Sequence, residues 1–253
     1  MKSRPTAATQ TATDIASAAQ PHGAAPSVLR LHAASLRFGA VQALHGVSLQ
    51  VARGERLAVV GANGSGKSSL LRLLNGLSKP QAGTLALEPG LRQAMVFQRP
   101  WMLRASAQNN VALGLWLAGT PWRPARAQAL LALAQVGLAQ HAEQNAKTLS
   151  GGQQQRLALA RAWAMQPEVL LLDEPTANLD PHAKKEVETL MARFAQQGCT
   201  LVFSSHNLGQ VKRLATRVVY IEHGVLVADL PVDAFFNGPL PEAAAQFLKG
   251  EMG

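Results

Sequence analysis

Residues 61–68 read GANGSGKS, which fits the spacing G-x-x-x-x-G-K-[ST] of a loop that holds nucleotide phosphates. The apolar run LAVV precedes this motif, and the helical pattern SSLLRLLNGL follows it. A strand, a glycine-rich loop and a helix in this order direct backbone N–H groups at an anion near the helix N-terminus. The motif therefore predicts an α/β fold with a phosphate site at the carboxyl end of a buried strand.

The residue types inside this loop predict separate roles in holding a nucleotide. We expect the ammonium of Lys67 to neutralise the β- and γ-phosphates and the hydroxyl of Ser68 to bind Mg²⁺. The N–H groups of residues 64–69 are expected to surround the phosphate oxygens, an approach that side chains at Gly64 and Gly66 would block. The predicted phosphate-binding residues are Gly61, Ala62, Asn63, Gly64, Ser65, Gly66, Lys67, Ser68 and Ser69.

Short apolar runs alternate with helical patterns along the rest of the chain. This rhythm is typical of a P-loop core with a mostly parallel sheet covered by helices. Residues 28–50 alternate between apolar and polar side chains, which predicts an antiparallel β subdomain at one edge. Residues 99–165 are rich in Ala, Leu and Gln, which indicates a helical insertion. A further helix is expected between a cap at Asp180 and a stop at Gly198.

Composition narrows the class of protein. The longest apolar runs fall far short of the roughly 18 residues that span a bilayer. The single cysteine, Cys199, lies in an apolar run and has no disulfide partner in the chain, which favours a buried thiol in a reducing compartment. The net charge of +9 is scattered without a Lys/Arg run, so we expect no nucleic-acid partner. Residues 1–27 are expected to form a disordered extension, and residues 28–253 the nucleotide-binding domain.

Two carboxylates end the apolar run VLLLDEP at residues 169–175. Neighbouring residues of a strand point to opposite faces, so Asp173 and Glu174 are expected to have separate roles. Asp173 is predicted to join the Mg²⁺ shell, usually through water, and Glu174 to act as general base on an attacking water.

Two further polar residues follow apolar runs. Gln98 ends MVFQ, and His206 comes just after LVFSS. Because ligands of open α/β sheets bind at the carboxyl ends of the strands, both side chains are expected near the γ-phosphate. Gln98 would offer its amide oxygen to Mg²⁺ and water, and His206 would donate a hydrogen bond to the phosphate.

The motifs GANGSGKS, Gln98, LSGGQ, LLLDEP, ANLD at residues 177–180 and His206 occur in this order. Together they resemble the ATPase subunit of ATP-binding cassette (ABC) transporters, over residues 28–228. The resemblance implies a head-to-tail pair of chains, with each ATP between the phosphate loop of one chain and the Ser-Gly-Gly helix start of the other. It implies that Phe38 stacks on adenine, where tyrosine is commoner. The residues implied to act on the partner's nucleotide are Ser150, Gly151, Gly152 and Gln153.

Two features indicate which branch of the family the chain resembles: the number of residues after His206 and the sequence of this C-terminal segment. Only 47 residues follow His206 in the 253-residue chain, too few for an added regulatory domain. The tail ADLPVDAFFNGPLPEAAAQFLKGE resembles tungstate-importer subunits, so we expect ATP-driven import of tungstate or a related oxyanion. A phosphate or polar amino-acid importer subunit remains an alternative, as does a non-transport ABC ATPase acting on nucleic acid or a ribosome.

The importer interpretation implies partners and a location. We expect a peripheral subunit on the cytoplasmic face of the inner membrane, bound to permease subunits and through them to an extracytoplasmic substrate-binding protein. The apolar residues Trp101, Met102 and Leu103 follow Gln98 in a loop, where the family docks its permease. They are the expected permease contacts, and the alternative is that they pack in the core of the helical insertion.

Overall fold

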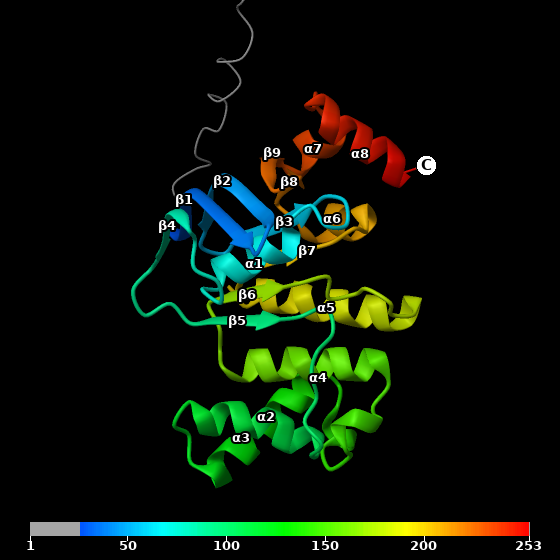
Figure 1. Cartoon of the computed structure of the whole chain (residues 1–253). Helices are drawn as coiled ribbons and strands as arrows, with labels where there is room; N and C mark the ends of the chain where they lie inside the picture. Colours follow the sequence, from blue (N-terminus) through cyan, green and yellow to red (C-terminus); the bar gives the residue numbers. More distant parts are fainter. Residues whose placement is uncertain (1–25, 253) are drawn as a thin grey trace, which may run out of the picture.

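The computed structural model describes residues 26–252 (Figure 1). The first 25 residues of the expected N-terminal extension lie outside this range, and Ser27 already belongs to the first strand. Within residues 26–252 no helix is long and apolar enough to cross a membrane.

The main sheet has six strands, of which the first five in spatial order run parallel and the last is antiparallel. Strands β6 and β7 are buried along their whole length, as expected for parallel strands covered on both faces. The predicted mostly parallel core is therefore confirmed. In spatial order the strands are β5 (Gln93–Val96), β6 (Val169–Leu172), β7 (Thr200–Ser204), β3 (Arg56–Val60), β8 (Arg217–Glu222) and β9 (Val225–Pro231).

A second sheet is antiparallel and has the order β2 (Val41–Ala52), β1 (Ser27–Phe38) and β4 (Ala82–Leu87). It confirms the predicted antiparallel subdomain and adds β4, which the sequence analysis did not identify. Helix α1 (Lys67–Leu74) packs its leucines between the two sheets, in one cluster with Leu29 and Leu57 (Figure 1). The residues that begin α1 are thus held from two sides.

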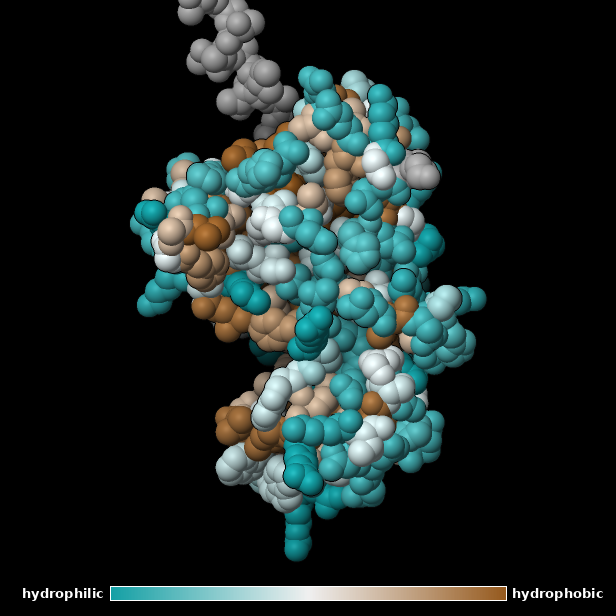
Figure 2. Space-filling view, turned by 45° about the vertical axis from the view of Figure 1, so that its right-hand side comes forward, coloured by the Kyte–Doolittle hydropathy of each residue, from teal (hydrophilic) through white to brown (hydrophobic). Residues whose placement is uncertain are grey.

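The expected helical insertion forms the lower part of the molecule in Figure 1 and in the space-filling view of Figure 2. It consists of α2 (Ala107–Leu117), α3 (Trp122–Gln135), two 3₁₀ turns (Ala139–His141 and Ala146–Thr148) and α4 (Gly151–Ala164). The remaining helices are α5 (Pro181–Gln196), α6 (Leu208–Leu214), α7 (Val232–Asn237) and α8 (Glu242–Met252).

Helix α5 begins and ends at the residues that the sequence predicts. The Asp180 side chain accepts hydrogen bonds from the N–H groups of His182 and Ala183, and Gly198 follows the helix with φ +89°. The predicted apolar face of α5 is buried, and Phe194 on this face stacks on Trp163 of α4 with ring centroids 4.0 Å apart. Helix α5 thereby joins the helical insertion to the main sheet.

The start of α4 also packs closely on α5. A Cβ atom added to Gly152 would lie 2.6 Å from the Cβ atom of Ala183, whereas one added to Gly151 would meet only Leu179 Cδ2, at 3.9 Å. Gly152 therefore has a packing role that the sequence analysis did not foresee.

These two neighbouring glycines give a matched test of that packing. We expect Gly152→Ala to lower the free energy of unfolding by about 1–3 kcal/mol, the usual effect of overpacking a tight contact. Gly151→Ala, in the same helix turn, is expected to leave it unchanged or to raise it slightly, because alanine favours helix. Denaturant unfolding of both variants measures the difference, and equal stabilities would contradict the close contact.

Candidate functional site

The phosphate loop joins β3 to α1 and depends on its glycines for two reasons. A Cβ atom at Gly61 would lie 2.2 Å from the carbonyl oxygen of Ile221, and one at Gly66 would lie 2.7 Å from that of Ala43. Gly64 faces open space, but its φ of +79° is one that other residues rarely adopt. The loop is therefore fixed by close packing at its ends and by backbone conformation at its middle.

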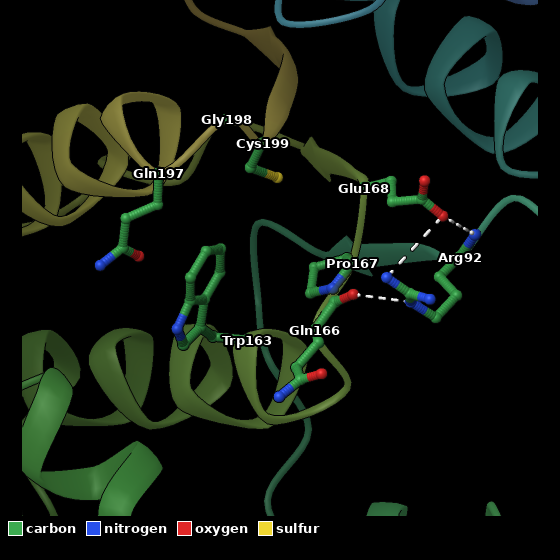
Figure 3. Close-up of a pocket in the computed structure, with 8 residues that line it drawn as sticks. All are labelled: Arg92, Trp163, Gln166, Pro167, Glu168, Gln197, Gly198 and Cys199. Carbon is green, nitrogen blue, oxygen red and sulfur yellow. Dashed lines mark hydrogen bonds and ion pairs between the residues drawn. The ribbon is translucent and has the colours of Figure 1, made fainter.

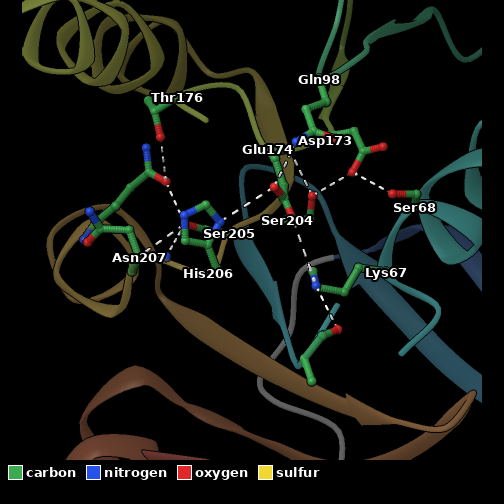
Figure 4. Close-up of polar contacts among 12 residues, drawn as sticks. Lys67, Ser68, Gln98, Asp173, Glu174, Thr176, Ser204, Ser205, His206 and Asn207 are labelled. Atoms are coloured by element: carbon green, nitrogen blue, oxygen red, sulfur yellow. Dashed lines mark hydrogen bonds and ion pairs between the residues drawn. The ribbon is translucent and has the colours of Figure 1, made fainter. Parts of the chain in front are cut away.

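Lys67 is buried inside the loop. Its Nζ atom donates to the carbonyl oxygens of Gly61 at 2.8 Å and Ala62 at 3.0 Å, and lies 3.8 Å from Oε1 of Glu174 (Figure 4). Burial lowers the pKa of the Lys67 ammonium, while the charges of Glu174 and Asp173 act in the opposite direction. The chain thus holds a cation within its phosphate loop, as the sequence predicts.

The loop also contains Ser65, whose Oγ atom is buried with no hydrogen-bond partner within residues 26–252. A buried hydroxyl left unpaired is unfavourable, and an oxygen of a bound phosphate would pair with it. This orphaned donor fits the predicted anion site.

Asp173 follows β6 and is 4% exposed. Its Oδ1 atom accepts hydrogen bonds from the hydroxyls of Ser68 at 2.9 Å and Ser204 at 2.8 Å. Hydroxyl, carboxylate and amide oxygens are the donors that Mg²⁺ prefers, and Ser68, Asp173 and Gln98 supply these three types. The donor set fits the predicted Mg²⁺ site.

Glu174 has φ +43° and is one of five non-glycine residues with positive φ within the described part of the chain. Strand β6 ends at Leu172, so strand alternation does not direct the two carboxylates, and that reason for their separate roles was wrong. Instead, the left-handed backbone turns Glu174 toward the loop while Asp173 continues toward Ser68.

The Glu174 carboxylate is the meeting point of three elements. Its Oε2 atom accepts from Nε2 of Gln98 at 3.2 Å and lies 3.4 Å from Nδ1 of His206 (Figure 4). The side chain of Glu174 is 13% exposed and that of His206 is 54% exposed. The structure therefore brings Gln98, His206, Lys67 and Asp173 around the expected base.

Comparison with known proteins then places this site in a family. A model of the ABC transporter family matches residues 44–177, and the glutamine transport ATP-binding protein GlnQ of Escherichia coli (strain K12) is 36% identical over 230 residues. That match covers 85% of this chain and 96% of GlnQ. The chain belongs to the ABC transporter family.

Other ABC relatives include the methionine import ATP-binding protein MetN of Brucella abortus (strain 2308), which is 39% identical over 236 residues. The match covers 85% of this chain but only 63% of MetN, so the chain spans less than two thirds of that relative's length. The glutamate/aspartate import ATP-binding protein GltL of Escherichia coli (strain K12) is 37% identical, over 83% of this chain and 94% of GltL.

Solved ABC structures share the fold. The dimeric cassette MJ0796 bound to ADP and Pi superposes with a TM-score of 0.72 and 27% identity, over 81% of this chain and 98% of that one. The cbiO1 protein of Clostridium perfringens, part of the transporter complex cbiONQ, gives a TM-score of 0.75 and 27% identity, over 83% and 90% of the two chains. The predicted fold class is confirmed.

The ABC-specific Ser-Gly-Gly segment lies apart from the phosphate loop of the same chain. It begins α4 in the lower part of Figure 1, whereas the loop begins α1 in the upper part. Ser150 and Gln153 form a capping box, with Ser150 Oγ accepting from the N–H of Gln153 and Gln153 Oε1 from that of Ser150. The side chain of Gln153 also reaches Nε2 of His141 at 3.2 Å, so within one chain it serves the helix start.

Phe38 ends β1 and is 47% exposed. An exposed aromatic residue fits the stacking role that the ABC resemblance implies. That role remains a prediction.

Four polar residues near the Asp173 and Glu174 carboxylates were missed by the sequence analysis: Thr176, Ser204, Ser205 and Gln210. The Ser204 hydroxyl donates a hydrogen bond to Asp173, and Gln210 Oε1 accepts hydrogen bonds from the hydroxyls of Thr176 at 3.4 Å and Ser205 at 2.7 Å. All four are buried, which is uncommon for polar residues. Ser204 carried a signal, because a serine ends a strand that is otherwise apolar apart from its first residue, Thr200.

A separate hollow of about 460 Å³ (Figure 3) is lined by residues beside the amino ends of β5, β6 and β7. Asp173, Glu174 and Gln98 follow the carboxyl ends of two of these strands. Here the Glu168 carboxylate accepts a hydrogen bond from the backbone N–H of Arg92. The Arg92 side chain donates to the carbonyl oxygen of Gln166 at 2.9 Å. Cys199 is buried as predicted, and burial raises the pKa of its thiol to about 12. The predicted site residues do not line this hollow.

Proposed function

We propose that the chain is the ATP-hydrolysing subunit of an ABC importer. The observation that carries the proposal is a pair of contacts between the carboxyl ends of β3 and β6. The Ser68 hydroxyl donates to Asp173 Oδ1 at 2.9 Å, and Nζ of Lys67 lies 3.8 Å from Oε1 of Glu174. A buried cation for phosphate, oxygen ligands for Mg²⁺ and a carboxylate base are the parts that phosphoryl transfer to water requires.

Each residue contributes one function in this proposal. Ser68, Asp173 and Gln98 would hold a Mg²⁺ ion, which would supply neutralisation of phosphate charge when bound. Lys67 binds the phosphate oxygens once it leaves the Gly61 and Ala62 carbonyls. Glu174 takes the proton of the attacking water, and His206 donates to the γ-phosphate.

Two copies of the chain complete each site in this proposal. Residues 150–153 and the phosphate loop are separate within one chain, and the similar cassette MJ0796 is dimeric. In a head-to-tail pair, residues 150–153 of one copy face the nucleotide held by Lys67 of the other, and Phe38 stacks on its adenine.

The permease is proposed to dock beside Gln98, on the cytoplasmic face of the membrane. Trp101 is 70% exposed and available for such a contact, whereas Met102 is 4% exposed and belongs to the hydrophobic core. The expectation that Met102 contacts the permease was therefore wrong, because its side chain packs inward. Trp101, with the partly buried Leu103, remains the proposed contact, and an extracytoplasmic binding protein would act through the permease.

We propose an amino acid as the transported substrate. The names of GlnQ, GltL and MetN specify glutamine, glutamate/aspartate and methionine, which favours the amino-acid alternative. Tungstate has no support among these relatives, and neither a ribosome nor a nucleic acid is named for them.

The first test of ATP hydrolysis is Glu174→Gln. This variant keeps the size and hydrogen bonding of residue 174 but removes its basic oxygen, so turnover should fall by about 10²–10⁴ while ATP and Mg²⁺ still bind. Asp173→Asn should instead weaken Mg²⁺–ATP binding as well as turnover. ATPase assays and light scattering of the ATP-bound dimer distinguish the two, and near-normal hydrolysis by Glu174→Gln would reject the base assignment.

A mixture of two inactive variants tests the shared site. Ser150→Arg should fill the space for the partner's γ-phosphate, and Lys67→Ala should disable its own phosphate loop. In a heterodimer one site carries both defects and the other carries neither, so partial ATPase activity should return. The control is each variant alone, and a purified heterodimer without activity would count against shared sites.

The substrate is tested with the chain coexpressed with its own permease and binding protein. In reconstituted membranes, glutamine, glutamate or methionine should stimulate ATP hydrolysis, whereas tungstate and phosphate should not. Stimulation by an oxyanion alone would reverse the assignment. Copurification with ribosomes in place of a membrane protein would reject import altogether.

A further inference from the structure

Strand β7 ends in a buried serine that touches both carboxylate residues of the site. Ser204 is fully buried, and its Oγ atom lies 2.8 Å from Oδ1 of Asp173 and 2.8 Å from the backbone nitrogen of Glu174 (Figure 4). One hydroxyl therefore links the proposed Mg²⁺ ligand to the proposed base.

The direction of both hydrogen bonds is fixed by the groups involved. The Glu174 N–H is a donor only, so the Ser204 oxygen must accept from it. A serine hydroxyl has a single proton, and the ionised Asp173 carboxylate is an acceptor only, so that proton points at Asp173 Oδ1. The bond to a charged acceptor is also the stronger kind.

The hydrogen bond from the Glu174 N–H to Ser204 also holds the backbone of Glu174 in an unfavourable conformation. Glu174 has φ +43°, a conformation that is strained for a side chain of this size and persists only where its surroundings enforce it. The N–H of Asp173 is held separately, by the carbonyl oxygen of Val96 at 2.9 Å. Ser204 is the contact that anchors the N–H of the strained residue itself.

We propose that Ser204 is a positioning residue of the ATPase site. It orients the Asp173 carboxylate and fixes the backbone turn that aims Glu174 at the attacking water. When Ser68 turns its hydroxyl oxygen to Mg²⁺, Ser204 keeps Asp173 Oδ1 hydrogen bonded. The inference rests on the proposed function, because both groups that Ser204 positions are assigned there.

The test compares two hydroxyl deletions on one strand. Ser204→Ala removes the bridge. Thr200→Val, at the other end of β7, removes a hydroxyl that is equally buried and accepts from the N–H of Gly54 at 2.8 Å, far along the strand from Asp173. Each variant removes one buried hydroxyl, with two hydrogen bonds lost in Ser204→Ala and one in Thr200→Val, so the control accounts for the general loss of stability that follows from deleting a buried hydroxyl.

The Ser204→Ala variant should lose turnover but keep its affinity for ATP. We expect kcat to fall by about tenfold to a hundredfold, the range for a misplaced catalytic group, while the Kd for ATP stays within about twofold because the phosphate loop is unchanged. The Mg²⁺ concentration for half-maximal rate should rise. Thr200→Val should keep wild-type kcat and Mg²⁺ dependence.

A measurement on the nucleotide-free chain makes the inference independent of activity. In Ser204→Ala, the N–H of Glu174 should exchange with deuterium faster than in the wild type, as read by NMR, while that of Asp173 stays protected by Val96. Unchanged exchange at Glu174, a kcat within twofold of wild type, or equal loss of kcat in the two variants would each overturn the proposal.

The outcome is separable from failure of the proposed function. If the chain were not an ATPase, the wild type and Glu174→Gln would not differ, whereas failure of this inference alone leaves that difference intact. If Ser204→Ala does not fold, Ser204→Thr and Ser204→Val decide, because they share a shape and differ by the hydroxyl. Tenfold higher turnover in Ser204→Thr supports the role, and equal turnover overturns it.

Discussion

Two buried charges of opposite sign determine how this site is built. Lys67 is 5% exposed and Asp173 is 4% exposed, and removing such groups from water is unfavourable unless partners replace the lost hydration. The Gly61 and Ala62 carbonyls do so for Lys67, and two serine hydroxyls do so for Asp173. Those partners come from the loop after β3, from α1 and from β7, so the strand order β6-β7-β3 is what makes the pairing geometrically possible.

The phosphate loop, the parallel core and α5 could be predicted because each leaves a local pattern in the sequence. Glu174 illustrates what could not be predicted: its direction depends on φ +43°, which Ser204 stabilises from 30 residues away. Met102 illustrates a second limit, since an apolar residue in a loop is equally compatible with docking and with core packing. Such long-range contacts decide the outcome only once the chain has folded.

The Ser-Gly-Gly segment combines two requirements that the sequence does not separate. The first N–H groups of a helix lack intrahelical acceptors, and the capping box satisfies those of Ser150 and Gln153. The N–H groups of Gly151 and Gly152 therefore stay available to an anion, as the proposed dimer requires. Gly152 must in addition be small because Ala183 lies directly against it. One residue thus serves both the packing of α4 on α5 and the proposed partner site.

The close packing of α4 on α5 connects the Glu174 loop to the helical insertion. Helix α5 follows the Asp173 and Glu174 loop directly and packs on α4, whose first turn is the proposed contact with the partner's nucleotide. A shift of the Glu174 loop would therefore reach α4 through α5, because closely packed helices move together rather than deform. Trp101 lies on the same path, since its carbonyl oxygen accepts from Arg161 of α4 at 2.7 Å. The helix proposed to face the partner's nucleotide thus also holds the proposed permease contact, and in the proposed importer this contact would give hydrolysis a mechanical route to the membrane subunit.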